Sequence, residues 1–376
     1  MKNIPLSRSE LTDEKRNYLT IHYGDILINY NEILDVDNDK IYYIDKNLIF
    51  EKYEKSLIKN GDIIFADAAE DEIVGKCIEV SNISNQKIIS GLHTIPCRNK
   101  YIFSEKYLGY YFNSQNYHNQ LLSLMQGVKV LSISKNSLNN TIVFFPKEYA
   151  EQKKIGNYLN SIDICISFFN KKIDVLKKFK QRMLLKMFPR DGEDTPEIRF
   201  KHYQQKWNKS KIKDICSIST GKSNTQDNDE NGLYPFYVRS PIIEKSNRYL
   251  YDEEAVLTVG DGVGTGKVFH YVNGKYDLHQ RVYRLFNFTN NVNAKFFYFW
   301  FSNNFYKRIM SMTAKTSVDS VRYNMIADMI LFYPSIDEQI KIGLFFSRLD
   351  NMLNLLNKKI KQLKTLKQSL LSKMFI

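Results

Sequence analysis

The sequence predicts a mixed α/β (α+β) protein made of two related units, each ending in a long helix. Two observations support this prediction. Residues 151–188 and 338–375 align without a gap and are identical at 18 of 38 positions. Both copies also carry apolar residues at the spacing that places one stripe along a helix. Because the copies lie 187 residues apart, half of the 376-residue chain, the repeat indicates one architecture used twice.

The apolar residues of each repeat alternate in steps of four and three, which is typical of helices that pair with similar helices. A stripe about 50 Å long needs a covering surface, so we expect the two helices to pair with each other. The alternative is that each helix packs on its own unit. One heptad position is lysine in both copies, Lys180 and Lys367. The predicted coiled-coil interface consists of Ile155, Leu159, Ile162, Ile166, Phe169, Ile173, Leu176, Ile342, Phe346, Leu349, Leu353, Leu356, Ile360 and Leu363.

Composition is that of an ordinary globular protein, with 43% hydrophobic and 14% aromatic residues, enough for two cores. The four cysteines form no Cys-x-x-Cys pair, and no His/Cys cluster has metal-ligand spacing. The longest aromatic run, residues 296–301, is far too short to span a bilayer. We therefore expect a reduced, cytoplasmic protein with no metal site and no membrane segment.

Positive charge is concentrated in the repeat. The net charge of the chain is +13, and residues 151–190 and 338–376 contribute +7 and +6, so the rest of the chain is balanced. A lysine-rich helix face is often only a solvated face. It would also attract a polyanion, and phosphate contacts are the usual source of nucleic-acid affinity.

A fainter repeat precedes each helix. The shared order is a Gly-Asp pair in a strand-like context, a Leu-His pair on a strand, an aromatic helix, and a polar segment that leads into a strand and a proline. The Gly-Asp pairs are residues 61–62 and 260–261, and the Leu-His pairs are 92–93 and 278–279. The aromatic helices are 106–117 and 295–306, and the polar segments with their strands and prolines are 132–146 and 320–334. Most residues between these features differ, which suggests one fold that carries two different surfaces.

No catalytic motif is evident. The glycine-rich run 260–267 lacks the spacing and the final Ser/Thr of a phosphate-binding loop, and we expect a surface hairpin there. His93 and His279 have no nucleophile or carboxylate pattern that would complete a triad. We therefore predict no catalytic residue in this chain.

The repeated motifs resemble those of the specificity (S) subunits of type I restriction-modification enzymes. They are Glu-Gln-x-Lys-Ile-Gly at 151–156 and 338–343, the central Asn-Lys-Lys-Ile, the closing Lys-Met-Phe, and Gly-Leu-His-Thr-Ile at 91–95 with Lys-Val-Leu-Ser-Ile-Ser at 129–134. One departure concerns Trp207–Ile215, which resembles the family's signature at the start of a domain. No counterpart of this signature precedes the first domain.

This resemblance implies two target recognition domains separated by two long conserved helices that form an antiparallel coiled coil. The implied domains are 1–146, target recognition domain 1; 147–190, conserved helix 1 and linker; 191–334, target recognition domain 2; and 335–376, conserved helix 2. It further implies a non-catalytic subunit that reads DNA sequence. A spacer of about 50 Å, compared with about 34 to 36 Å per turn of duplex, predicts a bipartite site on double-stranded DNA with a gap of roughly one turn. Two methyltransferase (M) subunits would bind S-adenosylmethionine, and two restriction (R) subunits would bind ATP and Mg.

Arg, Lys, Asn, Gln, Ser and His offer the donors and acceptors that fit base edges. The candidate DNA-binding residues are Lys76, His93, Arg98, Lys129, Ser132 and Lys135 in the first domain, and Lys222, Asn224, Gln226, Arg239, Gln280, Arg281, Lys315, Ser317 and Arg322 in the second. Three other functions remain open from the residues alone: a DNA-binding regulator or adaptor without enzyme partners, a self-contained methyltransferase or nuclease, and a coiled-coil scaffold that binds no nucleic acid.

Overall fold

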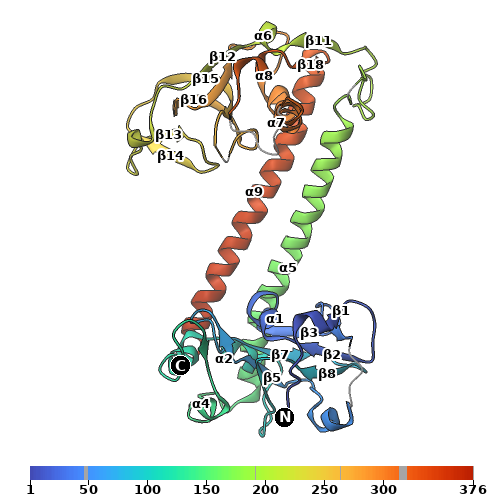
Figure 1. Cartoon of the computed structure of the whole chain (residues 1–376), viewed down its shortest axis with the longest axis vertical. Helices are drawn as coiled ribbons and strands as arrows, with labels where there is room; N and C mark the ends of the chain where they lie inside the picture. Colours follow the sequence, from blue (N-terminus) through green and yellow to red (C-terminus); the bar gives the residue numbers. More distant parts are fainter. Residues whose placement is uncertain (46–49, 191, 263, 313–319, 376) are drawn as a thin grey trace. The chain divides into compact units, whose positions relative to one another are not determined.

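The computed structural model divides into two compact units (Figure 1). Unit 1 comprises Met1–Lys171 and Asn357–Ile376, and unit 2 comprises Lys172–Leu356. The two long helices, α5 (Tyr149–Lys186) and α9 (Ile336–Lys373), each contribute residues to both units. The structure describes residues 1–45, 50–190, 192–262, 264–312 and 320–375.

Unit 1 contains two four-stranded sheets. The first has the order β1-β4-β2-β8, and the second has the order β3-β7-β5-β9. Their strands are β1 (Leu11–Thr12), β2 (Tyr18–Ile21), β3 (Ile33–Asp35), β4 (Tyr42–Ile44), β5 (Ile63–Ala66), β7 (Cys77–Ser81), β8 (Lys87–Ser90) and β9 (Thr94–Cys97). The central strands β5 and β7 are buried along their whole length; β5 is apolar throughout, as is typical of a strand covered on both faces, whereas β7 also buries Glu79 and Ser81.

Short helices and a two-stranded ribbon complete unit 1. The ribbon pairs β6 (Ala68–Ala69) with β10 (Leu131–Ser132). The aromatic helix predicted for residues 106–117 is broken in two, because the Ser114 side chain caps the second helix by accepting a hydrogen bond from the Tyr117 N–H. The helices are α1 (Tyr23–Ile28), α2 (Tyr107–Phe112), α3 (Gln115–Leu122) and α4 (Lys135–Asn139).

Unit 2 is built on a six-stranded sheet of order β12-β17-β15-β16-β13-β14. A separate antiparallel ribbon pairs β11 (Asn208–Lys211) with β18 (Ile330–Tyr333). The six strands are β12 (Ser217–Thr220), β13 (Tyr234–Tyr237), β14 (Ile243–Ser246), β15 (Tyr251–Val259), β16 (Phe269–Leu278) and β17 (Val282–Phe286). Helices α6 (Ile212–Ile215), α7 (Ala294–Ser311) and α8 (Tyr323–Ala327) accompany them.

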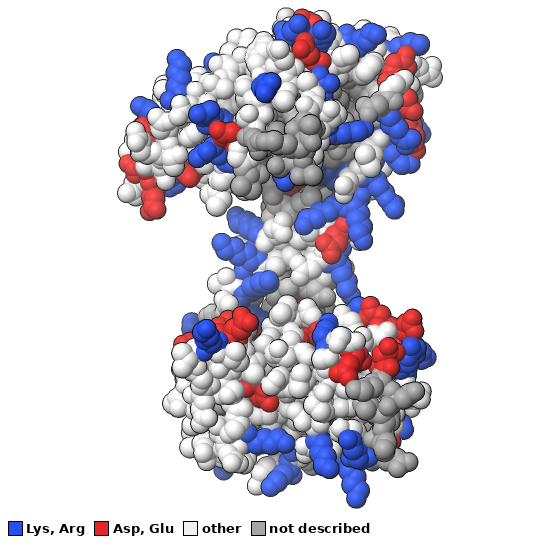
Figure 2. Space-filling view, viewed as in Figure 1, with Lys and Arg blue, Asp and Glu red and all other residues white. Residues whose placement is uncertain are grey.

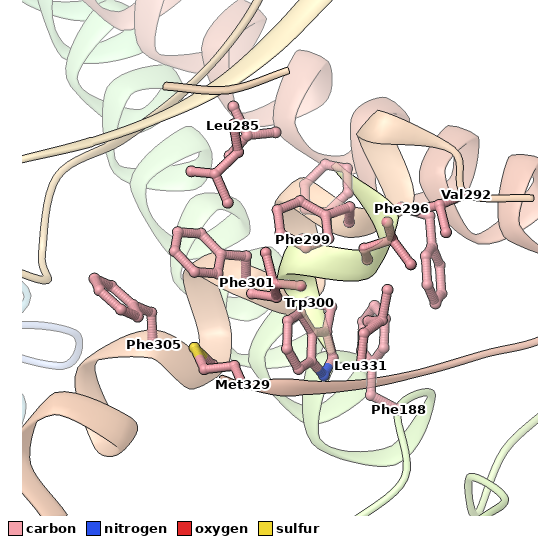
Figure 3. Close-up of a cluster of buried hydrophobic side chains, with 14 of the residues drawn as sticks. Phe188, Leu285, Val292, Phe296, Phe299, Trp300, Phe301, Phe305, Met329 and Leu331 are labelled. Atoms are coloured by element: carbon pink, nitrogen blue, oxygen red, sulfur yellow. The ribbon is translucent and has the colours of Figure 1, made fainter. Parts of the chain in front are cut away.

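The main core of unit 2 is aromatic (Figure 3). Helix α7 supplies most of its rings, and Phe296, Phe301 and Phe305 are completely buried. Phe188, from the Lys-Met-Phe end of the first repeat, packs against Phe296 with ring centroids 5.3 Å apart. The same ending of the second repeat serves unit 1, where Phe375 packs on Tyr107 of α2. The closing motif of each repeat is therefore a core anchor.

The repeated Glu-Gln motif fixes the start of each long helix. In unit 1 the Gln152 side chain accepts a hydrogen bond from the Ser104 N–H at 3.0 Å and donates to the carbonyl of the proline ahead of α5 at 2.8 Å. In unit 2 Gln339 does the same with the Asn293 N–H and with the proline ahead of α9. Both glutamines are buried, so these bonds satisfy polar groups that water cannot reach.

The repeated Ile-Gly motif lets each long helix approach the aromatic helix of its unit closely. A Cβ atom added to Gly156 would lie 3.1 Å from the Tyr107 nitrogen, and one added to Gly343 would lie 3.2 Å from the Phe296 nitrogen. These two contacts identify α2 and α7 as equivalent elements. The glycines are thus required by packing rather than by backbone conformation.

The long helices pair antiparallel within each unit. In unit 1 the first half of α5 lies against the last turns of α9, where Lys367 bonds Asp163. In unit 2 the roles are exchanged, and Lys180 of α5 bonds Asp350 of α9. All fourteen predicted interface residues are buried or half-buried. Ile155, Leu159, Ile342 and Phe346 also join the cores of the units, so both interpretations of the stripe apply.

One predicted strand is missing from unit 1. Residues 142–145 have the sequence Ile-Val-Phe-Phe before Pro146, closely similar to the Ile-Leu-Phe-Tyr of β18 before Pro334. They form no strand, because among the described residues of unit 1 no strand pairs with them in the way that β11 pairs with β18. None of the helices in the described ranges combines the length and the apolar character needed to cross a lipid bilayer.

Candidate nucleic-acid interface

Predicted DNA-binding residues of unit 2 gather around a hollow of about 350 Å³ where β16 ends and β17 begins. They come from three segments that are far apart in the sequence: the polar loop after β12, the end of β13 and the turn between β16 and β17. The lining residues are Asn224, Thr225, Gln226, Arg239, His279, Gln280 and Arg281. Five of these seven residues were predicted from the sequence, and the hollow therefore assembles much of the predicted site.

Backbone hydrogen bonds hold the turn that carries three of these side chains. The His279 N–H donates to the Tyr237 carbonyl at 3.0 Å, and the Gln280 N–H donates to the Ser223 carbonyl at 2.8 Å. The Arg281 N–H donates to Nδ1 of His279 at 3.0 Å. Because Nδ1 accepts this bond, the proton of the neutral ring lies on Nε2, which faces the Thr225 hydroxyl at 3.4 Å. Burial and the charge of Arg239 lower the pKa of His279, which favours this neutral form.

Two arginines at this hollow share one carboxylate. Arg239 and Arg281 lie 3.6 and 3.5 Å from the carboxylate oxygens of Asp261, and more than half of each arginine side chain is exposed. Exposed pairs at such distances contribute little to stability. Asp261 therefore orients the two guanidinium groups without neutralising both. The pair leaves one net positive charge and free donors directed to solvent, as phosphate or guanine recognition requires.

A buried polar network lies beneath the same turn. Asp277 is completely buried, and its carboxylate accepts hydrogen bonds from the hydroxyls of Ser223 at 2.6 Å and Ser246 at 3.0 Å. The guanidinium of Arg248 lies 3.6 Å away. Because these partners satisfy the buried charge, the network stabilises the base of the hollow and positions the loop that begins at Ser223.

The equivalent position in unit 1 carries a different residue. The Asp67 N–H donates to the His93 carbonyl at 3.0 Å, and the Gly260 N–H donates to the Arg281 carbonyl at 2.8 Å. His93 therefore corresponds to Arg281. The predicted equivalence of His93 with His279 is wrong by two residues, because a shared Leu-His dipeptide does not fix strand register. His93 also contacts a carboxylate, with Nδ1 3.2 Å from Asp67, and has a φ of 52°.

The second side of each site is formed by the segment before α4 or α8. In unit 1 Ser132 pairs with Ala68, beside Asp67, and the exposed Lys129 lies in the preceding loop. In unit 2 Ser320 bridges to Asp261, and the next N–H, of Val321, donates to the Gly260 carbonyl. The exposed Arg322 follows directly. The predicted residues Lys315 and Ser317 lie outside the described residues.

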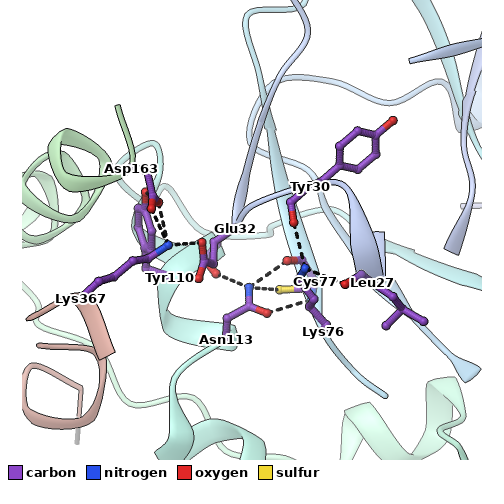
Figure 4. Close-up of polar contacts among 10 residues, drawn as sticks. Leu27, Tyr30, Glu32, Lys76, Cys77, Tyr110, Asn113, Asp163 and Lys367 are labelled. Carbon is purple, nitrogen blue, oxygen red and sulfur yellow. Dashed lines mark hydrogen bonds and ion pairs between the residues drawn. The ribbon is translucent and has the colours of Figure 1, made fainter. Parts of the chain in front are cut away.

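Two predicted residues of unit 1, Lys76 and Arg98, have other partners, and Figure 4 shows those of Lys76. Lys76 donates to the carbonyls of Leu27 and Tyr30 at 3.1 and 2.9 Å, and burial lowers its pKa. Arg98 donates two hydrogen bonds, of 2.8 and 2.6 Å, to the buried carboxylate of Asp62.

Lys135 and Lys222 are both exposed. Lys135 lies 3.4 Å from the Met1 carbonyl, whereas only the backbone N–H of Lys222 has a bond, to the Leu278 carbonyl. Structural partners of this kind depend on contacts that the sequence does not reveal.

Two acidic residues belong to the sites although the prediction did not include them. Asp261 and Asp67 each contact the equivalent basic side chain, Arg281 or His93. The prediction considered only basic and neutral polar side chains, so it did not include carboxylates. The available signal was the Gly-Asp at 260–261, which the prediction paired with 61–62 instead.

Basic side chains also follow the long helices (Figure 2). Lys171, Lys172, Lys177 and Lys178 are exposed on α5, and Lys358, Lys359, Lys361 and Lys364 are exposed on α9. Figure 2 shows few acidic side chains beside them. The charge excess of the repeat therefore faces solvent, in agreement with both interpretations of a lysine-rich helix face.

Comparison with known proteins supports the resemblance seen in the repeat. Residues 204–365 match the family model described as type I restriction modification DNA specificity domain. The type I restriction enzyme EcoDI specificity subunit of Escherichia coli is 26% identical over 147 residues, 39% of this chain and 31% of that protein. The MjaVIII specificity subunit of Methanocaldococcus jannaschii is 23% identical over 278 residues, 67% of this chain and 65% of that protein. The matches thus span about a third and about two thirds of these relatives.

A solved structure has the same fold along the whole chain. The S subunit of a type I restriction-modification system from M. genitalium superposes with a TM-score of 0.66 and 16% identity, covering 100% of this chain and 93% of that one. At this identity the likeness concerns the fold alone. In sequence over part of its length, and in fold, the chain is thus similar to the specificity subunits of type I restriction-modification systems.

Proposed function

We propose that this chain is the DNA sequence-recognition subunit of a type I restriction-modification complex and has no catalytic role of its own. Each unit would read one half of a bipartite target on double-stranded DNA. The observation that carries this proposal is that two unlike side chains, His93 in unit 1 and Arg281 in unit 2, occupy equivalent backbone positions, and that each contacts a nearby carboxylate, Asp67 or Asp261. One scaffold presenting different side chains at the same place suits a reader of two different half-sites.

Chemistry on the DNA would come from partners. Two methyltransferase subunits would bind S-adenosylmethionine and methylate adenine N6, and two restriction subunits would use ATP and Mg. The exposed lysines of α5 and α9 would add phosphate contacts that are independent of sequence. The helices would also set the separation of the half-sites, for which we propose a gap of about one turn of duplex.

A second candidate is a DNA-binding regulator or adaptor that works without enzyme partners. The same hollow and the same basic surface would serve it. Size-exclusion chromatography of the chain with a cognate methyltransferase subunit separates the two functions. Co-elution as a stoichiometric complex supports the specificity subunit, whereas separate elution combined with sequence-specific DNA binding supports the regulator.

Genome-wide mapping of methylated adenines tests the reading of half-sites. We expect loss of the methylated motif when the gene is deleted. Arg281→Ala should relax the motif in one half only, and His93→Ala should relax the other half only, because the two residues lie in different units. Lys245→Ala is the matched control for Arg281, since Lys245 is an exposed basic residue on β14 of the same unit and does not line the hollow. An unchanged motif in both site variants would contradict this assignment.

A further inference from the structure

An open apolar hollow of about 620 Å³ lies on unit 1, between the first turns of α5 and the end of α9. Its lining residues are Glu151, Lys154, Ile155, Asn157, Tyr158 and Met374. Glu151 and Lys154 are exposed, and half of the Tyr158 side chain is exposed. Since the long helices are repeats, each of these residues has a counterpart in unit 2, and the two surfaces can be compared position by position.

In unit 2 a segment of the chain covers this surface. Glu338, the counterpart of Glu151, is only 1% exposed because Arg199 donates two hydrogen bonds to it, at 2.9 and 2.7 Å. Phe345, the counterpart of Tyr158, contacts the ring of Phe200 with centroids 6.3 Å apart. The covering residues thus begin with an arginine followed by an aromatic side chain.

The covering segment continues with two further aromatic side chains. Lys341, the counterpart of Lys154, lies over the ring of Tyr203 at 4.9 Å. Trp207 is 5% exposed and packs on Phe296, with ring centroids 5.8 Å apart. Immediately after Trp207 the chain forms β11, which pairs antiparallel with β18. Residues 199–211 therefore cover the helix surface and then extend the ribbon as one continuous segment.

Unit 1 has the segment that matches β18, but this segment forms no strand and pairs with none among the described residues. Residues 142–145 correspond to 330–333 of β18, and Phe144 and Phe145 are 55% and 45% exposed. The Ile142 and Phe144 N–H groups donate to side chains of the same unit, the amide of Gln120 and the hydroxyl of Tyr111. Among the described residues, the N–H groups of Val143 and Phe145 have no partner.

The unpaired groups are the ones that an added strand would use. In unit 2 the Ile212 N–H donates to the Met329 carbonyl, and alternation along the register directs Leu331 and Tyr333 toward β11. Their counterparts are Val143 and Phe145. An edge with free N–H groups at alternate residues, flanked by exposed aromatic rings, favours addition of an extended segment.

We propose that this surface of unit 1, defined as the α5 groove together with edge residues 142–145, binds an extended segment of a partner polypeptide. The segment presents an arginine to Glu151, aromatic side chains to Tyr158 and Lys154, and a strand antiparallel to 142–145. The segment 199–211 shows the required chemistry in unit 2. A second copy of this chain is not the proposed occupant, because its own 199–211 segment is already engaged, with Trp207 and Glu338 buried.

The probe is a synthetic peptide of residues 197–215, added in trans to the full chain and followed by fluorescence anisotropy. We expect saturable binding. Glu151→Gln should weaken binding at least fivefold, because the arginine of the peptide loses its charged partner. Glu148→Gln is the matched control, since Glu148 is an exposed acid one turn earlier that does not line the groove. The affinity of this variant for the peptide should stay within twofold of the wild-type affinity.

Hydrogen exchange locates the bound peptide. The amides of Val143 and Phe145 should gain protection, and the protection of β18 should not change. Replacing peptide position Ser210 by proline should abolish the added protection at the edge, because proline lacks the N–H that pairs with the counterpart of Leu331.

Three results would overturn the proposal: no binding at millimolar peptide, protection confined to unit 2, or a dimer of the chain that Glu151→Gln dissociates. The last would make a second copy the occupant. The groove does not depend on DNA reading, so the Arg281→Ala chain should bind the peptide as the wild type does.

Discussion

The ammonium group of Lys367 lies 2.7 Å from Oδ1 of Asp163, and the exchanged pair, Lys180 with Asp350, occurs in unit 2. Each lysine also lies near an aromatic ring of its own unit, Tyr110 for Lys367 and Phe299 for Lys180. Both lysines occupy a heptad position that an apolar residue would normally fill. Each lysine–aspartate pair can form in only one antiparallel register of the two helices. A continuous apolar stripe alone would specify that register less strongly.

Replacing Lys367 should destabilise unit 1 more than replacing Lys180 destabilises unit 2. Lys367 also contacts Glu32 at 2.5 Å, and all three side chains of this cluster are 15% exposed or less. Lys367→Met would leave two buried carboxylates without a cation, at a cost of about 3 to 5 kcal/mol in the free energy of unfolding. Lys180 and Asp350 are 23% and 32% exposed, so Lys180→Met should cost about 1 kcal/mol. Urea unfolding of both variants measures the difference, and equal losses would contradict it.

The stability of unit 1 should fall as pH rises from about 4.5 to 7. Burial raises the pKa of Glu79 from 4.5 to about 7, although the carboxylate accepts hydrogen bonds from the Gly109 and Lys106 N–H groups. In this window the native chain holds a proton that the unfolded chain has released. The stabilisation is therefore complete below pH 4.5 and is lost as pH approaches 7, by up to about 3 kcal/mol.

Glu79→Gln tests this pH dependence, because an amide does not titrate. The free energy of unfolding of the variant should change less between pH 4.5 and 7 than that of the wild type. Glu72→Gln is the control, since Glu72 is an exposed acid of the same unit that does not act on Glu79. A variant with the same pH slope as the wild type would show that Glu79 does not hold the proton.

The glutamines of the repeat should contribute to stability in proportion to the bonds they make. Gln339 bonds the Asn293 N–H and two carbonyls, those of Asn291 and Pro334, and is completely buried. Gln339→Leu leaves these backbone groups unpaired and should cost about 2 to 3 kcal/mol. Thermal or urea unfolding measures the loss. Gln362→Leu, on the exposed face of α9, should have almost no effect.

Charge alone should not determine which basic residues bind DNA. Arg281→Ala should lower the slope of log affinity against log salt by about one, because an exposed cation near the duplex is removed. Lys76→Met should leave that slope unchanged and should lower stability instead, since its ammonium is bonded to two carbonyls inside unit 1. Titrations with a duplex at several salt concentrations separate the two effects. A reduced slope for the Lys76 variant would contradict the structural role.

Features set by local periodicity were predictable from the sequence. The stripe of each long helix and its pairing with the other copy follow from spacing and from the repeat. Features that depend on strand register were not. His93 corresponds to Arg281 because of one inter-strand hydrogen bond in each unit, and the dipeptide that suggested His279 carries no information about register.

The same limit explains the candidate residues that do not gather at a site. Lys76 and Arg98 are basic and close in sequence to site residues, yet their partners, Tyr30 and Asp62, come from segments more than 30 residues away. The segment 142–145 resembles a strand in sequence, but a strand also needs a neighbour. Local sequence cannot show whether that neighbour is present.

The exchanged pairs Asp163 with Lys367 and Asp350 with Lys180 mean that each half of the chain carries both complementary charges. A shorter ancestral gene encoding a single half would have given a product able to self-associate head to tail through the same two contacts. Duplication and fusion would preserve that association within one polypeptide. Mutation could then alter either recognition surface without disturbing how the halves join.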